Sequence, residues 1–179
     1  MNRAFIFALL LLCSPALIFA KDRFGRPDLA VSASTPKLSV ELSDSSLWDG
    51  RRVPRTMQCA RLGGQNPASP RLNVTNIPEA TKSLVMYVNN VRANDNHGLA
   101  RISEGRDGAT WTIPPLLSRA PIDALPKGIA LFDGGSDIGA AYSAPCPTGG
   151  SWQYVITVYA LGEKDEVLAV GEVSMGFAP

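Results

Sequence analysis

The sequence has little that could bind metal ions or polyanions. It contains a single histidine, His97, and three cysteines among 179 residues, which are too few soft ligands for a zinc site. Seventeen Lys and Arg residues face sixteen Asp and Glu residues, and no basic cluster exceeds Arg51, Arg52 and Arg55. A nearly neutral chain has no field that attracts nucleic acid. We therefore expect no metal, no cofactor and no nucleic-acid partner, and we interpret the three arginines as a solvated turn.

Long hydrophobic runs are missing after residue 20. Before it, a basic start at Arg3 and an apolar run over residues 4–12 lead to the small residue Ala20, which is the pattern of a cleavable signal peptide. The run is interrupted too early to span a bilayer, and bulky Leu12 argues against lipoprotein processing at Cys13. We expect residues 1–20 to be a signal peptide and the protein to be secreted or periplasmic, with no integral membrane segment after cleavage.

Cysteine is scarce in a way that fits export. Cys13 leaves with the predicted signal peptide, so Cys59 and Cys146 are the two that remain. An even pair in an oxidising compartment most economically forms one disulfide, and we predict that bond. Two separately buried thiols are the alternative.

Helical periodicity of useful length is absent, except for a short helical possibility over residues 116–125. Residues 21–36 mix charges, prolines and small residues and are predicted to be a flexible lead-in, followed by a single domain over 37–179. Apolar alternation or β-branched runs predict strands, whereas the polar, glycine-punctuated residues 89–110 predict a long loop. The predicted strands cover residues 38–42, 83–88, 111–113, 153–161 and 167–170. We therefore predict a mainly β protein, an antiparallel β-sandwich with few short helices.

The sequence offers few means of catalysis. No G-x-S-x-G elbow occurs, and His97 lies in a polar stretch that suggests a solvated loop histidine. The predicted disulfide would remove the thiol nucleophile. We predict a protein that is not an enzyme, and we keep a hydrolase using His97 as the least favoured alternative. Asn73 begins an N-glycosylation sequon, which matters only in an organism that glycosylates.

Two blocks of residues resemble the phosphatidylethanolamine-binding protein family, of the Raf-kinase-inhibitor-like type found in bacteria. Their order and spacing match over roughly residues 38–178. The first block is Cys59, Gly64, Asn66, Ser69-Pro70, Leu72, Pro78 and Thr81-Lys82-Ser83-Leu84. The second is Tyr142, Ala144-Pro145-Cys146-Pro147, Gly149, Trp152-Gln153-Tyr154 and Tyr159-Ala160-Leu161. The resemblance implies the family's β-sandwich and its small-ligand cleft.

The departures from the family pattern fall at its anion site. Where the family has an Asp-Pro-Asp segment after the central strand, this chain has Asn90 and Arg92 at the two acidic positions. One family histidine falls near Asp107 and another on Trp152, which offers one donor and a large apolar face. Arg92 could pair with Asp107 or hold an anion with two hydrogen bonds. The resemblance thus implies an altered cleft lined by Asn90, Arg92, Asp107, Trp111, Tyr142, Pro145, Trp152 and Tyr154.

These observations favour an exported, non-enzymatic binding module with an anionic or amphiphilic small molecule in its cleft. The resemblance also implies inhibition of a protein partner, which is common in this family. Two interpretations of the altered cleft stay open: it is retuned for another ligand, or it has decayed on a scaffold used for protein contacts. A structural or adhesive β-sandwich without a small ligand is the alternative from another class.

Overall fold

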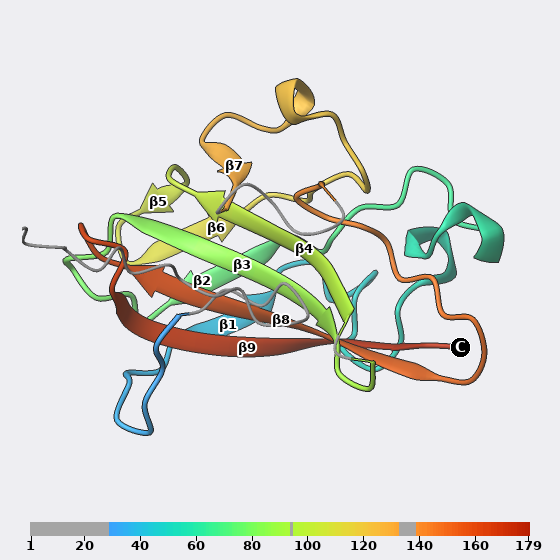
Figure 1. Ribbon diagram of the computed structural model, residues 1–179, viewed down its shortest axis with the longest axis horizontal. Coiled ribbons are helices and arrows are strands. Elements are labelled where there is room, and N and C mark those ends of the chain that lie inside the picture. Colours follow the sequence, from blue (N-terminus) through green and yellow to red (C-terminus); the bar gives the residue numbers. More distant parts are fainter. Residues whose placement is uncertain (1–28, 94, 133–138) are drawn as a thin grey trace, which may run out of the picture.

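Two antiparallel sheets make up the part of the chain that the computed structural model describes, which is residues 29–93, 95–132 and 139–179. The predicted signal peptide and the first half of the predicted lead-in lie outside these residues. The larger sheet has the strand order β7-β4-β3-β8-β9 and the smaller the order β1-β2-β6-β5, and the two are stacked (Figure 1). The predicted mainly β, antiparallel sandwich is therefore confirmed.

The larger sheet is built around β3, which is buried on both of its faces. Its strands are β3 (Ser83–Asn90), β4 (Asp95–Ile102), β7 (Ile129–Leu131), β8 (Trp152–Leu161) and β9 (Val167–Ala178). Successive side chains of a strand point to opposite faces, so Leu84 and Met86 enter the core between the sheets. Val85 and Tyr87 enter a second cluster on the outer face. This double burial explains the continuous apolar run that predicted a central strand.

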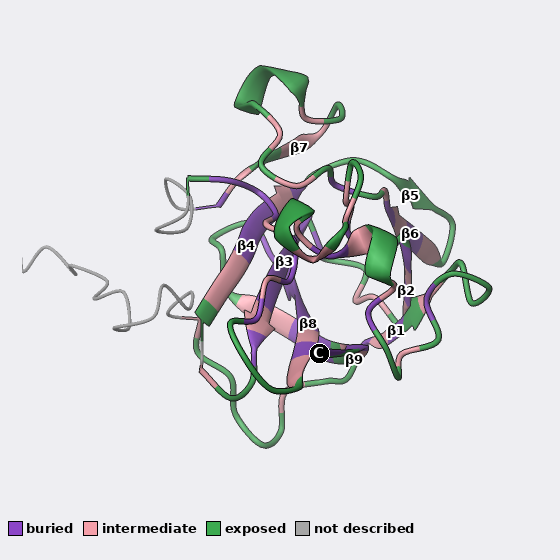
Figure 2. Ribbon diagram, turned by 90° about the vertical axis from the view of Figure 1, so that its right-hand side faces the viewer, coloured by how far each residue is buried: buried purple, intermediate pink, exposed green. Residues whose placement is uncertain are grey.

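The smaller sheet closes the main core from the other side. Its strands are β1 (Ser39–Leu42), β2 (Leu72–Thr75), β5 (Arg106–Asp107) and β6 (Thr110–Ile113). Val74 pairs with Trp111 across β2 and β6, and both side chains are almost fully buried in the core between the sheets (Figure 2). Asn73 of the sequon lies on β2, where its Oδ1 accepts a hydrogen bond from the Thr112 hydroxyl at 3.3 Å.

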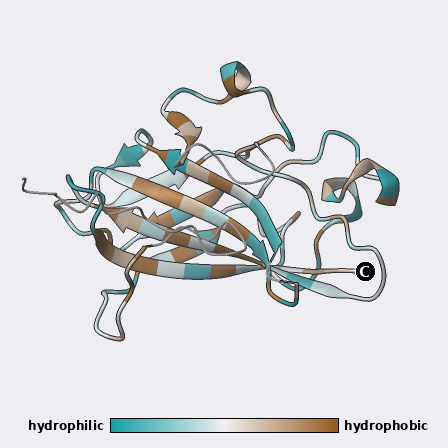
Figure 3. Ribbon diagram, in the orientation of Figure 1, coloured by the Kyte–Doolittle hydropathy of each residue, from teal (hydrophilic) through white to brown (hydrophobic). Residues whose placement is uncertain are grey.

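Two sequence predictions about secondary structure are wrong. Residues 89–110 are not a long loop: β4 follows β3 after a short turn and pairs with it, Asn90 facing Asp95. The polar residues that open β4 belong to the hydrophilic end of the sheet, where β3 also turns polar (Figure 3). The helical possibility over 116–125 reduces to one 3-10 turn, η3 (Ile122–Ala124). No helix in the described ranges is long and apolar enough to cross a membrane.

The predicted disulfide is present and ties two irregular segments together at the hydrophilic end. Cys59 and Cys146 have Cα atoms 5.2 Å apart. Cys59 lies between two short 3-10 turns, η1 (Arg55–Met57) and η2 (Ala60–Leu62), and Cys146 lies in the segment that leads into β8. The backbone N–H of Cys59 also donates to the carbonyl of Pro145 at 2.9 Å.

The end of β9 is held against the chain near residue 52. Arg52 forms a parallel bridge with Phe177. Gly176 has φ +104°, and a Cβ on it would lie 2.4 Å from the backbone nitrogen of Arg52. Only glycine fits this approach without strain, so the last strand can reach the η1–η2 segment because residue 176 is a glycine.

Candidate functional site

The site begins at the last residue of β3. Asn90 is fully buried, and its Oδ1 accepts hydrogen bonds from the backbone N–H groups of Arg92 at 2.9 Å and Ala93 at 3.1 Å. This side-chain turn starts the short connection to β4. The Nδ2 atom of Asn90 has no hydrogen-bond partner within the described residues. The amide is therefore fixed by its oxygen, while its Nδ2 group contacts the Tyr154 hydroxyl, whose pKa it lowers, without a hydrogen bond of standard geometry.

Two tyrosines lie beside this amide. Tyr154 of β8 is the register partner of Asn90. Burial raises the pKa of the Tyr154 hydroxyl, although its contacts with the Asn90 side chain and the Cys146 backbone lower it in part. Tyr142 is fully buried, and burial and the neighbouring Tyr154 together raise the pKa of its hydroxyl far above the ordinary value. The Tyr142 hydroxyl has no hydrogen-bond partner in the described part of the chain. Both tyrosines are neutral donors at physiological pH.

His97 also belongs to this cluster, which corrects the sequence analysis. It lies on β4, and its ring meets that of Tyr154 edge to face with centroids 5.0 Å apart. Its Nδ1 is 3.2 Å from the carbonyl oxygen of Ser143, and burial lowers the pKa of the imidazole. His97 is thus a half-buried strand residue and not a solvated loop residue. It also stands just before the buried part of the strand after β3, where the resemblance calls for a histidine that we had placed near Asp107.

Arg92 and Trp152 form the rim of the cluster. Both flank Gly150: a Cβ there would lie 3.9 Å from the Arg92 Nη1 and 3.9 Å from the Trp152 Nε1. The indole N–H of Trp152 donates to the Gly149 carbonyl at 2.7 Å, which fixes the ring across the start of β8. Arg92 is exposed, and Pro145 is buried next to the disulfide. The rim therefore offers one exposed positive charge and one fixed aromatic side chain.

Asp107 and Trp111 do not join the other predicted site residues. Asp107 is exposed on β5, at the edge of the smaller sheet and the opposite end of the molecule from the turn after Asn90 (Figure 1). Of the two roles suggested for Arg92, pairing with Asp107 is not among the ion pairs of the described residues. Trp111 is a core residue whose indole N–H donates to the Glu104 carbonyl at 2.6 Å. The error came from treating β4 as loop, which shifted the assignment into the smaller sheet.

The six remaining predicted site residues do come together. The turn after β3 and the segment before β8 contact each other directly, because the N–H of Val91 donates to the carbonyl of Gln153 at 3.0 Å and that of Ser143 to the carbonyl of His97 at 2.6 Å. The cluster consists of Asn90, Arg92, Tyr142, Pro145, Trp152 and Tyr154, with His97 added by the structure. We call it the polar cluster. No group of three or more His, Cys, Asp and Glu side chains in the described ranges is arranged to hold a metal.

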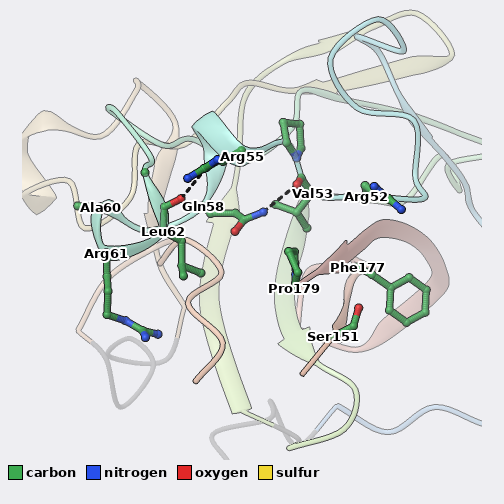
Figure 4. Close-up of a pocket in the computed structure, with 12 residues that line it drawn as sticks. Arg52, Val53, Arg55, Gln58, Ala60, Arg61, Leu62, Ser151, Phe177 and Pro179 are labelled. Carbon is green, nitrogen blue, oxygen red and sulfur yellow. Dashed lines mark hydrogen bonds between the residues drawn. The ribbon is translucent and has the colours of Figure 1, made fainter. Parts of the chain in front are cut away.

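A separate groove of about 900 Å³ lies beside the η1–η2 segment that contains Cys59 (Figure 4). It runs between the η1–η2 segment and the end of β9. Its lining includes Arg52 and Arg55, which the sequence analysis assigned to a solvated turn, and also Arg61. Sequence analysis missed this groove because its walls come from residues 52–63 and from residues 151–179, which only the fold brings together.

The two stacked antiparallel sheets, with a disulfide-linked loop over buried polar side chains at one end, define a β-sandwich. The chain belongs to the phosphatidylethanolamine-binding protein family, whose model matches residues 43–176. Comparison with the curated proteins gave no match.

Solved structures agree with the family in fold. The crystal structure of Escherichia coli YbcL, described as a new member of the mammalian PEBP family, superposes with a TM-score of 0.55 at 19% identity. That match covers 79% of this chain and 97% of YbcL. The Chlamydia trachomatis homologue CT736 gives a TM-score of 0.51 at 19% identity, covering 81% of this chain and 99% of that one.

Proposed function

We propose that the protein is an exported, non-enzymatic binding module whose polar cluster holds the head of a small anionic or amphiphilic molecule. One observation carries this proposal. The Tyr142 hydroxyl is a buried donor without a hydrogen-bond partner in the described residues, and the buried Asn90 Nδ2 has only its contact with the Tyr154 hydroxyl, which is not a hydrogen bond of standard geometry. Leaving a buried polar group unpaired costs about 1–3 kcal/mol, so such groups call for a functional explanation. Acceptor oxygens of a ligand would satisfy both.

The charge state of the cluster favours a ligand rich in acceptors. Burial keeps Tyr142 and Tyr154 protonated, because it raises the pKa of both hydroxyls. Burial lowers the pKa of His97, so its ring is neutral at pH 7. The interior thus presents neutral donors, and Arg92 supplies a positive charge at the rim. A carboxylate or phosphate ester fits donors of this kind with a cation close by.

The Trp152 face supports an amphiphilic ligand over a simple anion. Its ring is half-buried and is fixed by the bond to the Gly149 carbonyl. An indole presents a large apolar surface together with a single polar edge. An acyl or alkyl chain leaving the polar cluster beside Arg92 would lie against this ring.

A binding role is also favoured by what surrounds His97. A hydrolase would need a nucleophile in hydrogen-bond contact with the imidazole. The hydrogen-bond partner that the structure gives Nδ1 is the carbonyl of Ser143. A backbone carbonyl orients the ring and provides no nucleophile. The disulfide supports export, because such bonds persist in oxidising compartments.

The test measures ligand affinity and stability in the same variant. Tyr142→Phe removes a buried hydroxyl that bonds to nothing described, so we expect the melting temperature to stay equal or to rise. Binding of dodecyl phosphate, followed by Trp fluorescence and calorimetry, should weaken about tenfold or more, because a hydrogen bond to a charged group contributes about 1.5–3 kcal/mol. Tyr159→Phe, a buried tyrosine of the outer cluster, is the matched control and should bind as the native protein does.

Three results would contradict the proposal. Native protein that binds none of acetate, phosphoethanolamine and dodecyl phosphate would favour the structural or adhesive β-sandwich. Unchanged affinity in Tyr142→Phe would show that the ligand lies elsewhere. Esterase activity that His97→Ala abolishes would instead establish the hydrolase.

A further inference from the structure

The groove beside the η1–η2 segment is positively charged in a chain that is almost neutral. Its lining side chains include three arginines and no Asp or Glu, although the whole sequence carries 17 basic and 16 acidic residues. The ion pairs of the described residues are formed by Lys82, Arg101 and Lys127, so none of the three groove arginines is neutralised by a carboxylate side chain. The groove therefore concentrates unpaired positive charge.

Two of these arginines are held in place by backbone carbonyls. Arg61 donates from one terminal nitrogen to the Pro147 carbonyl at 2.6 Å and to the Cys146 carbonyl at 3.3 Å. Arg55 donates from its Nε to the Leu62 carbonyl at 3.3 Å, which leaves its two terminal nitrogens for a ligand. Carbonyls orient a guanidinium without cancelling its charge. Positioned arginines of this kind are suited to paired hydrogen bonds with carboxylates.

The charges lie on opposite sides of a recess that is partly apolar. Arg61 is on one side and Arg52 with Phe177 on the other, and Gln58 and Leu62 lie between them (Figure 4). Phe177 is 45% exposed, which is unusual for an aromatic side chain at the end of a strand. A single small anion cannot engage both sides together. A longer ligand with several negative groups and an apolar group matches this lining.

Gln58 indicates that the ligand has N–H groups of its own. Its side chain is 4% exposed, and its Nε2 donates to the Val53 carbonyl at 3.1 Å. The amide oxygen points toward the middle of the groove (Figure 4). The recessed Gln58 amide oxygen can accept a hydrogen bond from a peptide N–H. A fully ionised phosphate has only acceptor oxygens and cannot bond to it. A flat membrane surface would meet the exposed arginines before it reached this oxygen.

We propose that this groove binds an extended, acidic segment of a protein partner. Carboxylates of the segment pair with Arg52, Arg55 and Arg61, a backbone N–H donates to Gln58, and an apolar side chain packs on Phe177. Arginine and aromatic side chains are the residue types that dominate binding energy at protein interfaces. The groove is distinct from the polar cluster, since the two share none of their residues.

The test uses two fluorescein-labelled decapeptides, one alternating Glu and Tyr and the other Gln and Tyr. In an extended chain the alternation places all the carboxylates on one side. Fluorescence anisotropy with the protein in its disulfide-bonded form should show binding of the Glu peptide at least tenfold tighter than the Gln peptide. Raising the salt from about 50 to 500 mM should weaken it, because exposed charges are screened.

Substitutions locate the binding in the groove. The double variant Arg52→Gln, Arg55→Gln should bind the Glu peptide about tenfold more weakly or worse. The matching Arg52→Lys, Arg55→Lys variant keeps the charge, and its affinity should lie between those of the native protein and the Gln variant. Neither change touches the backbone bridge between Arg52 and Phe177. Arg71→Gln, an exposed arginine outside the groove, is the control and should bind as the native protein does.

Several outcomes would overturn the proposal. Equal binding of both peptides, or unchanged binding by the double Gln variant, would show that the groove does not recognise carboxylates. Complete displacement by millimolar inorganic phosphate would identify a small-anion site. Recruitment to phosphatidylglycerol vesicles without peptide binding would identify a membrane surface. Tyr142→Phe should leave peptide binding unchanged, so this proposal and the one on the polar cluster can fail separately.

Discussion

The disulfide joins two segments that are distant in the sequence, and this separation determines how much it should stabilise the fold. Cys59 and Cys146 are 87 positions apart. In the chain-entropy model, closing a loop of that length stabilises the folded state by about 4.6 kcal/mol at 25 °C. Domains of this size are stable by only about 5–15 kcal/mol in total. We expect the Cys59→Ala, Cys146→Ala double variant to lose about 4.6 kcal/mol, which is about a third of the stability at the upper end of this range and nearly all of it at the lower end.

The measurement is equilibrium unfolding in urea followed by tryptophan fluorescence, with linear extrapolation to water. The native protein under reducing conditions serves as a second version of the same perturbation and should lose a similar free energy. A loss below about 1.5 kcal/mol in both would refute the reasoning. It would mean that other contacts, such as those of Arg61 with Cys146 and Pro147, already hold the loop closed.

Two further predictions concern single residues. Because burial lowers the folded-state pKa of His97, the unfolded chain binds a proton more readily. The free energy of unfolding should therefore fall as the pH drops below about 6.5, by at most about 1.4 kcal/mol per pH unit. In urea unfolding at pH 7.5, 6.5 and 5.5, the free energy of unfolding of His97→Gln should not fall with pH in this way. If it falls as in the native protein, groups other than His97 cause the pH dependence. Gly176→Ala should lower the stability by about 2 kcal/mol or more in thermal unfolding, because its Cβ would lie 2.4 Å from the Arg52 backbone. Gly108→Ala, also at positive φ but with nothing within 4 Å, should lose about 1 kcal/mol, and equal losses would disprove the role of the close approach.

Strands whose own residues strongly favour β structure could be predicted from the sequence. Residues 153–161 are rich in β-branched and aromatic side chains, and the structure has β8 at Trp152–Leu161. The strand predicted to end at residue 170 continues as β9 to Ala178. Its extension contains Gly171, where a Cβ would lie 2.7 Å from the Leu38 carbonyl. A glycine that signals a turn in sequence is here needed for close packing, which depends on a distant segment.

Only part of the polar cluster could be predicted from the sequence, because the rest again depends on contacts with distant segments. Asn90, Tyr142 and Tyr154 were found because the residues around them match the family in order and spacing. His97 was missed because β4 opens with Asp95, Asn96 and a glycine, a composition typical of loops. Pairing with β3 overrides that local preference at the hydrophilic end of the sheet. A histidine two positions before the largely apolar residues 99–102 was the signal that could have identified it.

The segment from Tyr142 to Pro147 connects the two candidate sites, which explains why a disulfide is placed there. Its inner side supplies Tyr142 to the polar cluster, and its outer side supplies the carbonyls that position Arg61. In the described ranges it is not part of either sheet, so ladder hydrogen bonds do not hold it. It is held instead by single hydrogen bonds, such as those of Ser143 to the His97 carbonyl and of Cys59 to the Pro145 carbonyl, and by the covalent bond from Cys146 to Cys59. An irregular segment that presents different residues on two sides cannot obtain its rigidity from strand pairing, and the cross-link adds to these few hydrogen bonds.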